Sequence, residues 1–330
     1  MNETPNETPH DIDPVAVNLW HPIAAIESLR SGVAFPTVLL GQAIACGLGP
    51  DGARAIRRAD APAGDGWLAF PRIAAERKKA DGEGPEGDDA DRRYRPRDDT
   101  VRELPVRCAY GYLWTTLGDA PAPLFDLPEQ AEPDRRNVHA ATVGVRTSAP
   151  RAIENFLDMG HFPFVHTGIL GEEPHTEVLD YDVEERGDEI IATRCRFWQP
   201  QAAVGAAGGM LVDYVYRVPH PYCAVLYKSC PDDPTRLDVI ALFLQPVGEE
   251  SIRAHAFLSV VDAHSSDLAL RMFQQTIFGQ DKPILENQLP RRLPLDPRAE
   301  TPIRADRMAI AYRRMLARIG LRYGVIPVAA

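Results

Sequence analysis

The sequence of 330 residues lacks the features that mark several large classes of protein. It contains no apolar run close to the roughly 18 residues that a membrane-spanning helix requires, which excludes an integral membrane protein. Acidic residues outnumber basic ones by 47 to 36 and no block of Lys and Arg stands out, which argues against binding to nucleic acid. Apolar residues make up 45% of the chain, as in a globular protein with a sizeable core.

Cysteine is scarce, and its five copies form no Cys-x-x-Cys pair. They stand at Cys46, Cys108, Cys195, Cys223 and Cys230. The polar segment 1–15 has neither the basic region nor the apolar core of a secretory signal. We therefore expect a cytoplasmic protein whose thiols are free rather than joined in disulfides.

The distribution of apolar and polar residues suggests a disordered tail followed by two domains. We expect the tail to cover residues 1–17, because its first residues are polar and offer little to bury. The first domain, residues 18–135, has short β-like runs separated by Gly and Pro, which is typical of an all-β domain. Within it, the segment 76–99 consists mostly of charged residues and glycine, so we expect a solvated loop there. The second domain covers residues 136–330.

The second half has the pattern of an antiparallel sheet followed by a long helix. Strands are expected at residues 176–183, 189–197, 210–218, 223–229, 238–245 and 252–261. A helix is expected from Ser265 onwards, with Leu268, Met272 and Ile277 on one face, and a second amphipathic helix over residues 304–319. A curved sheet packed against a long helix is an α+β arrangement that encloses a pocket.

The segment 154–166 carries two histidines whose spacing points to a metal site. On a regular helix, His161 and His166 would point about 140° apart and could not easily share one ion. Pro163 lacks an amide hydrogen and clashes with the preceding turn, so we expect the helix to kink or end between the two rings. Such a break can bring both imidazoles to one point, and neutral imidazole suits iron, copper or zinc.

Asp281, on the long helix, is the candidate for a third ligand. Two His and one carboxylate with the other positions open are the arrangement of non-heme Fe(II) oxygenases. Closed structural zinc sites prefer four protein ligands, usually with thiolates, and no cysteine lies near these residues in sequence. The alternatives are structural roles: a satisfied polar histidine for either ring, and a helix cap or surface acid for Asp281.

These residues resemble the iron-site motif of the Rieske-type non-heme iron oxygenases. The motif Asn-Phe-Leu-Asp-x-x-His-Phe-Pro-Phe-Val-His covers residues 155–166, and the late segments 280–288 and 305–314 resemble the family's third-ligand and C-terminal helices. The resemblance spans residues 18–320 and is closest to the branch of vanillate O-demethylase and the methylxanthine N-demethylases. It implies a helix-grip fold for the second domain.

Carried over residue by residue, the resemblance implies that His161, His166 and Asp281 hold Fe(II). Asp158 would be the bridging acid of the catalytic site, which links the iron to a Rieske cluster in a neighbouring subunit. The alternative for Asp158 is a hydrogen bond that orients a ligating imidazole. The activity implied is that of the catalytic component of an oxygenase, which hydroxylates, or N- or O-demethylates, a small aromatic or heteroaromatic substrate with O2.

The sequence departs from the family at the Rieske [2Fe–2S] cluster, which needs two Cys and two His. The family supplies them as Cys-x-His and Cys-x-x-His, but residues 1–150 contain only Cys46 and Cys108, and neither is followed by His at that spacing. The loops expected to carry the two pairs are the segments 58–64 and 76–99. We therefore expect a degenerate Rieske-like β domain over residues 18–135 with no cluster in this chain.

Without a cluster, the two electrons that O2 activation requires would have to come through another protein. We expect a Rieske-containing oxygenase or reductase partner, in a trimer or a hetero-oligomer. Two other readings stay open at this point: a non-catalytic partner subunit of a hetero-oligomeric Rieske oxygenase, and a helix-grip ligand-binding protein that uses metal only structurally. Substoichiometric iron in the chain with unimpaired function of the complex would favour the non-catalytic subunit. Tight substrate binding without O2 consumption would favour the ligand-binding protein.

Overall fold

Antiparallel sheets and a few helices make up the computed structural model, which describes residues 12–49, 52–58, 101–206, 208–230, 233 and 235–328. The fold is therefore mixed α and β, as predicted. The expected loop at 76–99, and most of the segment 58–64, lie outside the described residues. Among the described residues, no helix combines the length and the apolar character that crossing a bilayer requires.

The N-terminal half holds two small sheets. One has the order β2-β3-β4-β5 and the other the order β1-β7-β6. Their strands are β1 (His21–Ala25), β2 (Phe35–Leu39), β3 (Gln42–Gly49), β4 (Gly52–Arg58), β5 (Val101–Leu104), β6 (Val106–Ala109) and β7 (Tyr112–Thr115). The positive φ of Gly111, 77°, lies in the tight turn between β6 and β7 and favours glycine there.

The prediction of a disordered tail over residues 1–17 is wrong for residues 12–17. Asp13 caps the short helix α1 (Pro14–Val17) through its Oδ1 atom, which accepts from the Val15 amide at 2.9 Å. Its Oδ2 atom accepts from the amides of Arg322 and Tyr323 at 2.6 and 2.8 Å. A single buried carboxylate thus ties this segment to the C-terminal end of the chain.

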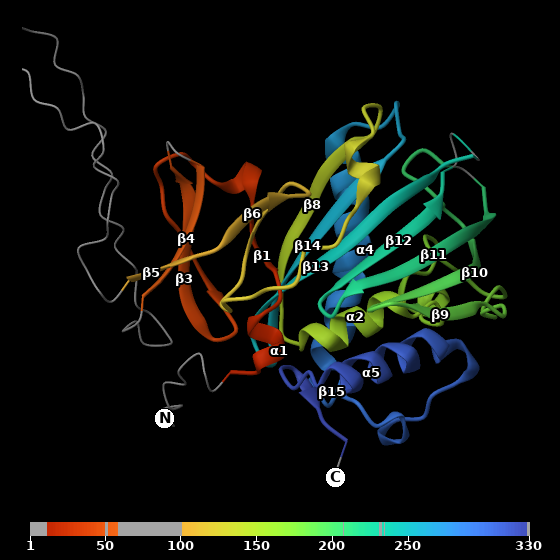
Figure 1. Cartoon of the computed structure of the whole chain (residues 1–330). Helices are drawn as coiled ribbons and strands as arrows, with labels where there is room; N and C mark the ends of the chain where they lie inside the picture. The colour runs from red at the N-terminus through yellow and green to blue at the C-terminus, as the bar shows by residue number, and fades with distance from the viewer. Residues whose placement is uncertain are drawn as a thin grey trace, which may run out of the picture.

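A seven-stranded antiparallel sheet forms the largest layer (Figure 1). Its order is β8-β14-β13-β12-β11-β10-β9, so consecutive strands are neighbours except that β8 pairs with β14. The strands are β8 (Arg136–Val145), β9 (Asp182–Arg186), β10 (Glu189–Gln199), β11 (Met210–His220), β12 (Cys223–Ser229), β13 (Leu237–Gly248) and β14 (Ser251–Val260). β8 was not predicted, and the strand expected at 176–183 lies at 182–186 instead.

The helices pack on this sheet. They are α2 (Ala149–Leu157), α3 (Phe162–Val165), α4 (Asp267–Asn287) and α5 (Arg307–Ile319). Short pieces complete the chain: η1 (Ile26–Ser28), η2 (Pro128–Ala131), η3 (Pro297–Ala299), η4 (Arg304–Asp306) and the parallel pair β15 (Leu293–Pro294) and β16 (Val325–Ile326). Ser148 and Ser266 cap α2 and α4 by accepting amide hydrogens at 3.2 and 3.1 Å. In Figure 1, α4 runs behind the strands, while α2 and α5 lie together at the sheet's lower end.

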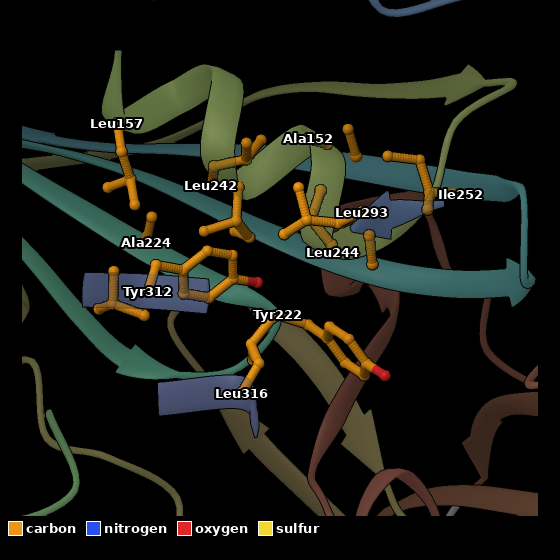
Figure 2. Packing of buried hydrophobic residues seen from close by; sticks show 14 of the residues in the cluster. Ala152, Leu157, Tyr222, Ala224, Leu242, Leu244, Ile252, Leu293, Tyr312 and Leu316 are labelled. Atoms are coloured by element: carbon orange, nitrogen blue, oxygen red, sulfur yellow. The ribbon is translucent and has the colours of Figure 1, made fainter. Parts of the chain in front are cut away.

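One core joins α2, α5 and the sheet. Figure 2 shows side chains of α2, β13 and α5 packed together, among them Leu157, Leu242 and Tyr312. All three are buried. Because Leu157 is the last residue of α2, this packing fixes where the chain leaves the helix, immediately before the segment that carries His161.

A buried ionic network reinforces the contact between α2 and α5. The guanidinium of Arg151 lies 2.8 Å from Glu154 and 2.8 Å from Glu300, and Arg313 lies 2.6 Å from Glu154. The Arg151 side chain has no exposed surface. Burial raises the pKa of Glu154 even though two guanidinium groups oppose that shift.

We expect Arg151→Met to destabilise the protein by about 3–5 kcal/mol, because it leaves Glu154 and Glu300 to share one buried guanidinium, that of Arg313. Urea unfolding measures the loss. The matched control is Arg186→Met, which breaks an exposed pair with Glu184 and should change the free energy of unfolding by no more than about 0.5 kcal/mol. Similar values for both variants would contradict a special role for the buried network.

Candidate metal centre

The two histidines flank one short helical turn. α2 ends at Leu157, His161 stands directly before α3, and His166 stands directly after it. The predicted break between the rings is therefore wrong: the helix ends before His161, and Pro163 lies in the first turn of α3. A proline is tolerated there because amides of the first turn have no partner within the helix. The imidazole rings of His161 and His166 come together because only the single turn of α3 separates the two residues.

Asp281 of α4 completes a group of three. The Nε2 atoms of His161 and His166 lie 3.1 Å apart. The Oδ1 atom of Asp281 lies 3.4 Å from the first and 3.1 Å from the second. These three side chains are the one group among the described residues in which at least three His, Cys, Asp or Glu ligand atoms lie close enough to share an ion.

Hydrogen bonds on the far side of each ring fix which nitrogen faces this point. His161 Nδ1 lies 3.0 Å from Asp158 Oδ2, and His166 Nδ1 lies 2.9 Å from Gln280 Oε1. Both oxygens only accept, so Nδ1 is the donor in each ring and a neutral ring turns the lone pair of Nε2 inwards. Within the described ranges, no hydrogen bond reaches Asp281 Oδ1 either. Three electron-pair donors thus face one another, which a cation between them would stabilise.

The charges around the site also favour a cation. Burial lowers the pKa of His161, but the carboxylates of Asp158 and Asp281 outweigh it and raise the pKa to about 9. For Asp281, burial raises the pKa, and the two imidazoles bring it below its usual value. The site therefore attracts positive charge, either as a proton on an imidazole or as a metal ion.

The structure places all four predicted site residues together and gives Asp158 its contacts. Besides His161, the Asp158 carboxylate accepts from the Gly160 amide at 2.7 Å. About a third of its side chain, 32%, stays exposed. The orienting role that sequence reasoning kept as an alternative is thus the contact the structure shows. Gln280 was missed as a functional residue, although it directly precedes Asp281.

We expect Gln280→Leu to weaken iron binding by roughly 10–100-fold, because such partners orient the ring that binds the metal. Gln280→Glu is the matched variant, since it keeps an oxygen acceptor for His166 Nδ1 and should bind iron at least as tightly as the native protein. Competition with a chelator of known affinity measures both. Unchanged affinity in Gln280→Leu would show that the contact does not position His166.

One cavity opens beside the three residues, between α4 and the sheet. Most of its wall is apolar. The lining includes Leu226, Ile240, Leu242, Leu258, Phe273 and Ile277. The hydroxyl of Tyr216, which also lines the cavity, is buried and finds no hydrogen-bond partner in the part of the chain that the structure describes. This arrangement is that of a site for a small, largely apolar molecule.

Comparison with known proteins places the chain in a family. Residues 145–322, more than half of the chain, match the vanillate O-demethylase oxygenase C-terminal domain. A protein named probable methylxanthine N7-demethylase, from Pseudomonas sp. (strain TJI-51), is 52% identical over 228 residues, which cover 68% of this chain and 81% of that protein. The chain belongs to the Rieske-type non-heme iron oxygenases. The resemblance seen in the sequence is confirmed.

Two solved structures share the fold of this chain. NdmA of Pseudomonas putida CBB5 superimposes with a TM-score of 0.66 at 20% identity, and the alignment covers 92% of each chain. Dicamba monooxygenase bound to 3,6-dichlorosalicylic acid gives a TM-score of 0.69 at 18% identity, covering 93% of this chain and 99% of the other. Because the chain belongs to this family, the protein is an oxygenase, and the family implies the use of iron.

Proposed function

We propose that this chain is the catalytic component of an Fe(II) oxygenase that demethylates or hydroxylates a small aromatic or heteroaromatic molecule. The observation that carries the proposal is the convergence of His161, His166 and Asp281 beside an apolar cavity, with ligand atoms 3.1–3.4 Å apart. Two His and one carboxylate with open positions suit Fe(II). The name of the 52% identical relative favours N-demethylation of a methylxanthine-like ring.

Each residue has a part in this proposal. His161, His166 and Asp281 would hold the iron, which supplies O2 activation for hydroxylation of a methyl group that is then lost as formaldehyde. Asp158 and Gln280 keep Nδ1 protonated on the two rings, so that both Nε2 atoms stay available. The apolar wall excludes water from the substrate side and holds a flat ring by contact.

The sequence supports the inference that this chain holds no [2Fe–2S] cluster of its own. The segment 59–100 contains neither Cys nor His, so it cannot supply cluster ligands. Cys46 and Cys108 are the only cysteines in residues 1–150, and neither is followed by His at the spacing of a Rieske motif. We therefore interpret residues 18–135 as a degenerate Rieske-like domain and residues 136–330 as a helix-grip domain.

Electrons would then come from a separate Rieske-bearing protein, in a trimer or a hetero-oligomer. Asp158 supports this part of the proposal because it is both partly exposed and hydrogen-bonded to His161. It thus offers a short bonded path from the surface to a ligand of the metal. We propose that a partner's cluster docks beside it.

Reconstitution tests the proposed function. The full chain loaded with Fe(II) should lack the visible absorption of a [2Fe–2S] centre and should release no formaldehyde from a methylated heteroaromatic substrate with a reductase that has no Rieske cluster. A Rieske-bearing reductase should restore formaldehyde release, and the His166→Ala variant should give none under the same conditions. A cluster spectrum from the chain alone, or failure of every Rieske protein to support turnover, would overturn the proposal.

A further inference from the structure

Three charged residues outside the metal centre line the cavity, Lys228, Asp238 and Asp262, and the first two interrupt its apolar sheet face. Lys228 of β12 and Asp238 of β13 are paired across the two strands, and both line the same cavity as the metal-site residues. Their neighbours two residues along each strand, Leu226 and Ile240, line it too, as the alternation of a strand requires. Lys228 is only 7% exposed, so its charge lies inside the protein.

The two charges leave hydrogen-bonding capacity unused. Lys228 Nζ donates to the carbonyl of Ala202, in the loop between β10 and β11, and the other two N–H groups of the ammonium have no partner among the described residues. Asp238 Oδ1 accepts from the Val261 amide at 2.8 Å, while Oδ2 receives no hydrogen bond there. Although they occupy paired positions, the described structure contains no ion pair between Lys228 and Asp238.

A buried charge without a close counter-ion is costly, since it has lost water without a full replacement. Lys228 is such a charge, whereas Asp238 is half-buried. Burial lowers the pKa of Lys228 to about 8, and Asp238 opposes that shift, so the amine remains mostly protonated at neutral pH. If Lys228 and Asp238 served only to stabilise the fold, we would expect them to form an ion pair. These two groups instead face a cavity that a ligand can enter.

Resting on the proposed function, we propose that Lys228 and Asp238 form a specificity subsite for the lactam edge of a heteroaromatic substrate. Lys228 donates to a ring carbonyl oxygen, and Asp238 accepts from the adjacent ring N–H. A lactam in a ring presents C=O and N–H side by side and in the ring plane, which matches a donor and an acceptor on neighbouring strands. A methyl group on that nitrogen would remove the donor and press an apolar group against the carboxylate.

The position of the subsite predicts which end of the substrate is oxidised. Lys228 is also paired with Tyr214 of β11, on its other side. The Tyr214 ring lies 6.4 Å from Phe162, whose ring lies 5.0 Å from His161. A ring held by its lactam edge at Lys228 therefore directs its opposite edge along this wall towards the metal centre. The methyl group that is removed should be the one remote from the lactam edge.

Equilibrium binding to the full iron-loaded chain tests this directly, with two probes that share the remote methyl group. The probes are 7-methylxanthine, whose lactam nitrogens carry hydrogen, and 1,3,7-trimethylxanthine, whose lactam nitrogens are methylated. We expect the first to bind at least about tenfold more tightly, because a ligand without the N–H donor would cover the half-buried carboxylate of Asp238 and leave it unpaired. Asp238→Asn should reduce that preference, and Lys228→Met should weaken both probes, since both carry ring carbonyls.

Asp213→Asn is the matched control, because Asp213 is exposed and pairs with Arg196 outside the cavity. It should bind both probes as the native chain does. Equal affinity of the native chain for the two probes, or no binding of either, would overturn the subsite even if one variant failed to fold. Because binding needs no electrons, a preference without turnover would instead point to failure of the proposed function, and turnover without a preference to failure of the subsite alone.

Discussion

Replacing His161 with alanine is expected to remove iron from the protein and to abolish turnover while leaving the fold in place. The ring supplies one of three inner donor atoms, so its loss should cost more than the roughly 10–100-fold that removal of an outer partner costs. The fold should persist because the side chain makes no capping bond to α3. Its polar contacts among the described residues are to Asp158, His166 and Asp281, all within the metal centre.

The measurement is the iron content per chain, determined by elemental analysis after equilibration with Fe(II). Circular dichroism confirms that the His161→Ala protein is folded. His175→Ala is the matched control. That ring is stacked on Trp198 with centroids 4.4 Å apart and is outside the three-residue group, so its loss should leave the iron content unchanged. If the His161→Ala protein kept iron equimolar with the chain, the ligand assignment would be wrong.

The convergence of the two histidines could be predicted because its information is local in the sequence, whereas Asp281 was proposed from its place on the long helix and from the family resemblance. His161 and His166 are five residues apart, so only one turn of chain has to fold correctly to bring them together. The mechanism of their convergence was predicted wrongly. Pro163 was expected to break a helix, but a proline is equally compatible with a helix start, and here α3 begins at Phe162.

Features set by distant partners could not be predicted in the same way. β8 was missed because it is held by pairing with β14 and by α4, whose Gln275 side chain donates to the Ala140 carbonyl at 2.7 Å. On α4 itself, Leu268 and Met272 were placed on the predicted apolar face but are exposed, whereas Leu270 and Phe278 are buried. Periodicity alone does not say which of two partly apolar stripes meets the sheet.

The polar part of the cavity shows the same limit. Lys228 and Asp238 are ten residues apart in sequence and have no motif, so nothing in the chain marks them as partners. They become neighbours only through the register of β12 and β13. A shift of that register by one residue would turn one of them to the other face. The proposed substrate-binding groups thus depend on the pairing of the sheet, and the proposed metal ligands on one short turn and one helix.

Asp158→Asn is expected to reduce partner-driven turnover far more than iron binding. Asparagine keeps one oxygen that can accept from His161 Nδ1, so loss of iron affinity should stay within the roughly 10–100-fold range of an outer partner. It loses the negative charge, which stabilises positive charge on His161. Its amide group also cannot replace the second carboxylate oxygen, which accepts from Gly160. The path from the exposed edge of the residue to the metal ligand is therefore disturbed.

Single-turnover formaldehyde release with a pre-reduced Rieske partner, compared with release driven by hydrogen peroxide, separates the two possible roles of Asp158. Peroxide brings oxygen already reduced by two electrons, so it needs no partner, and iron-loaded Asp158→Asn protein should keep this activity. Glu177→Gln, at an exposed acid with 76% of its side chain accessible, is the control and should behave as the native chain in both assays.

If Asp158→Asn lost iron, peroxide-driven release and partner-driven release in equal measure, Asp158 would only orient His161. Loss confined to the partner-driven reaction requires that electrons enter past this carboxylate, because the metal, the cavity and the substrate are the same in both assays.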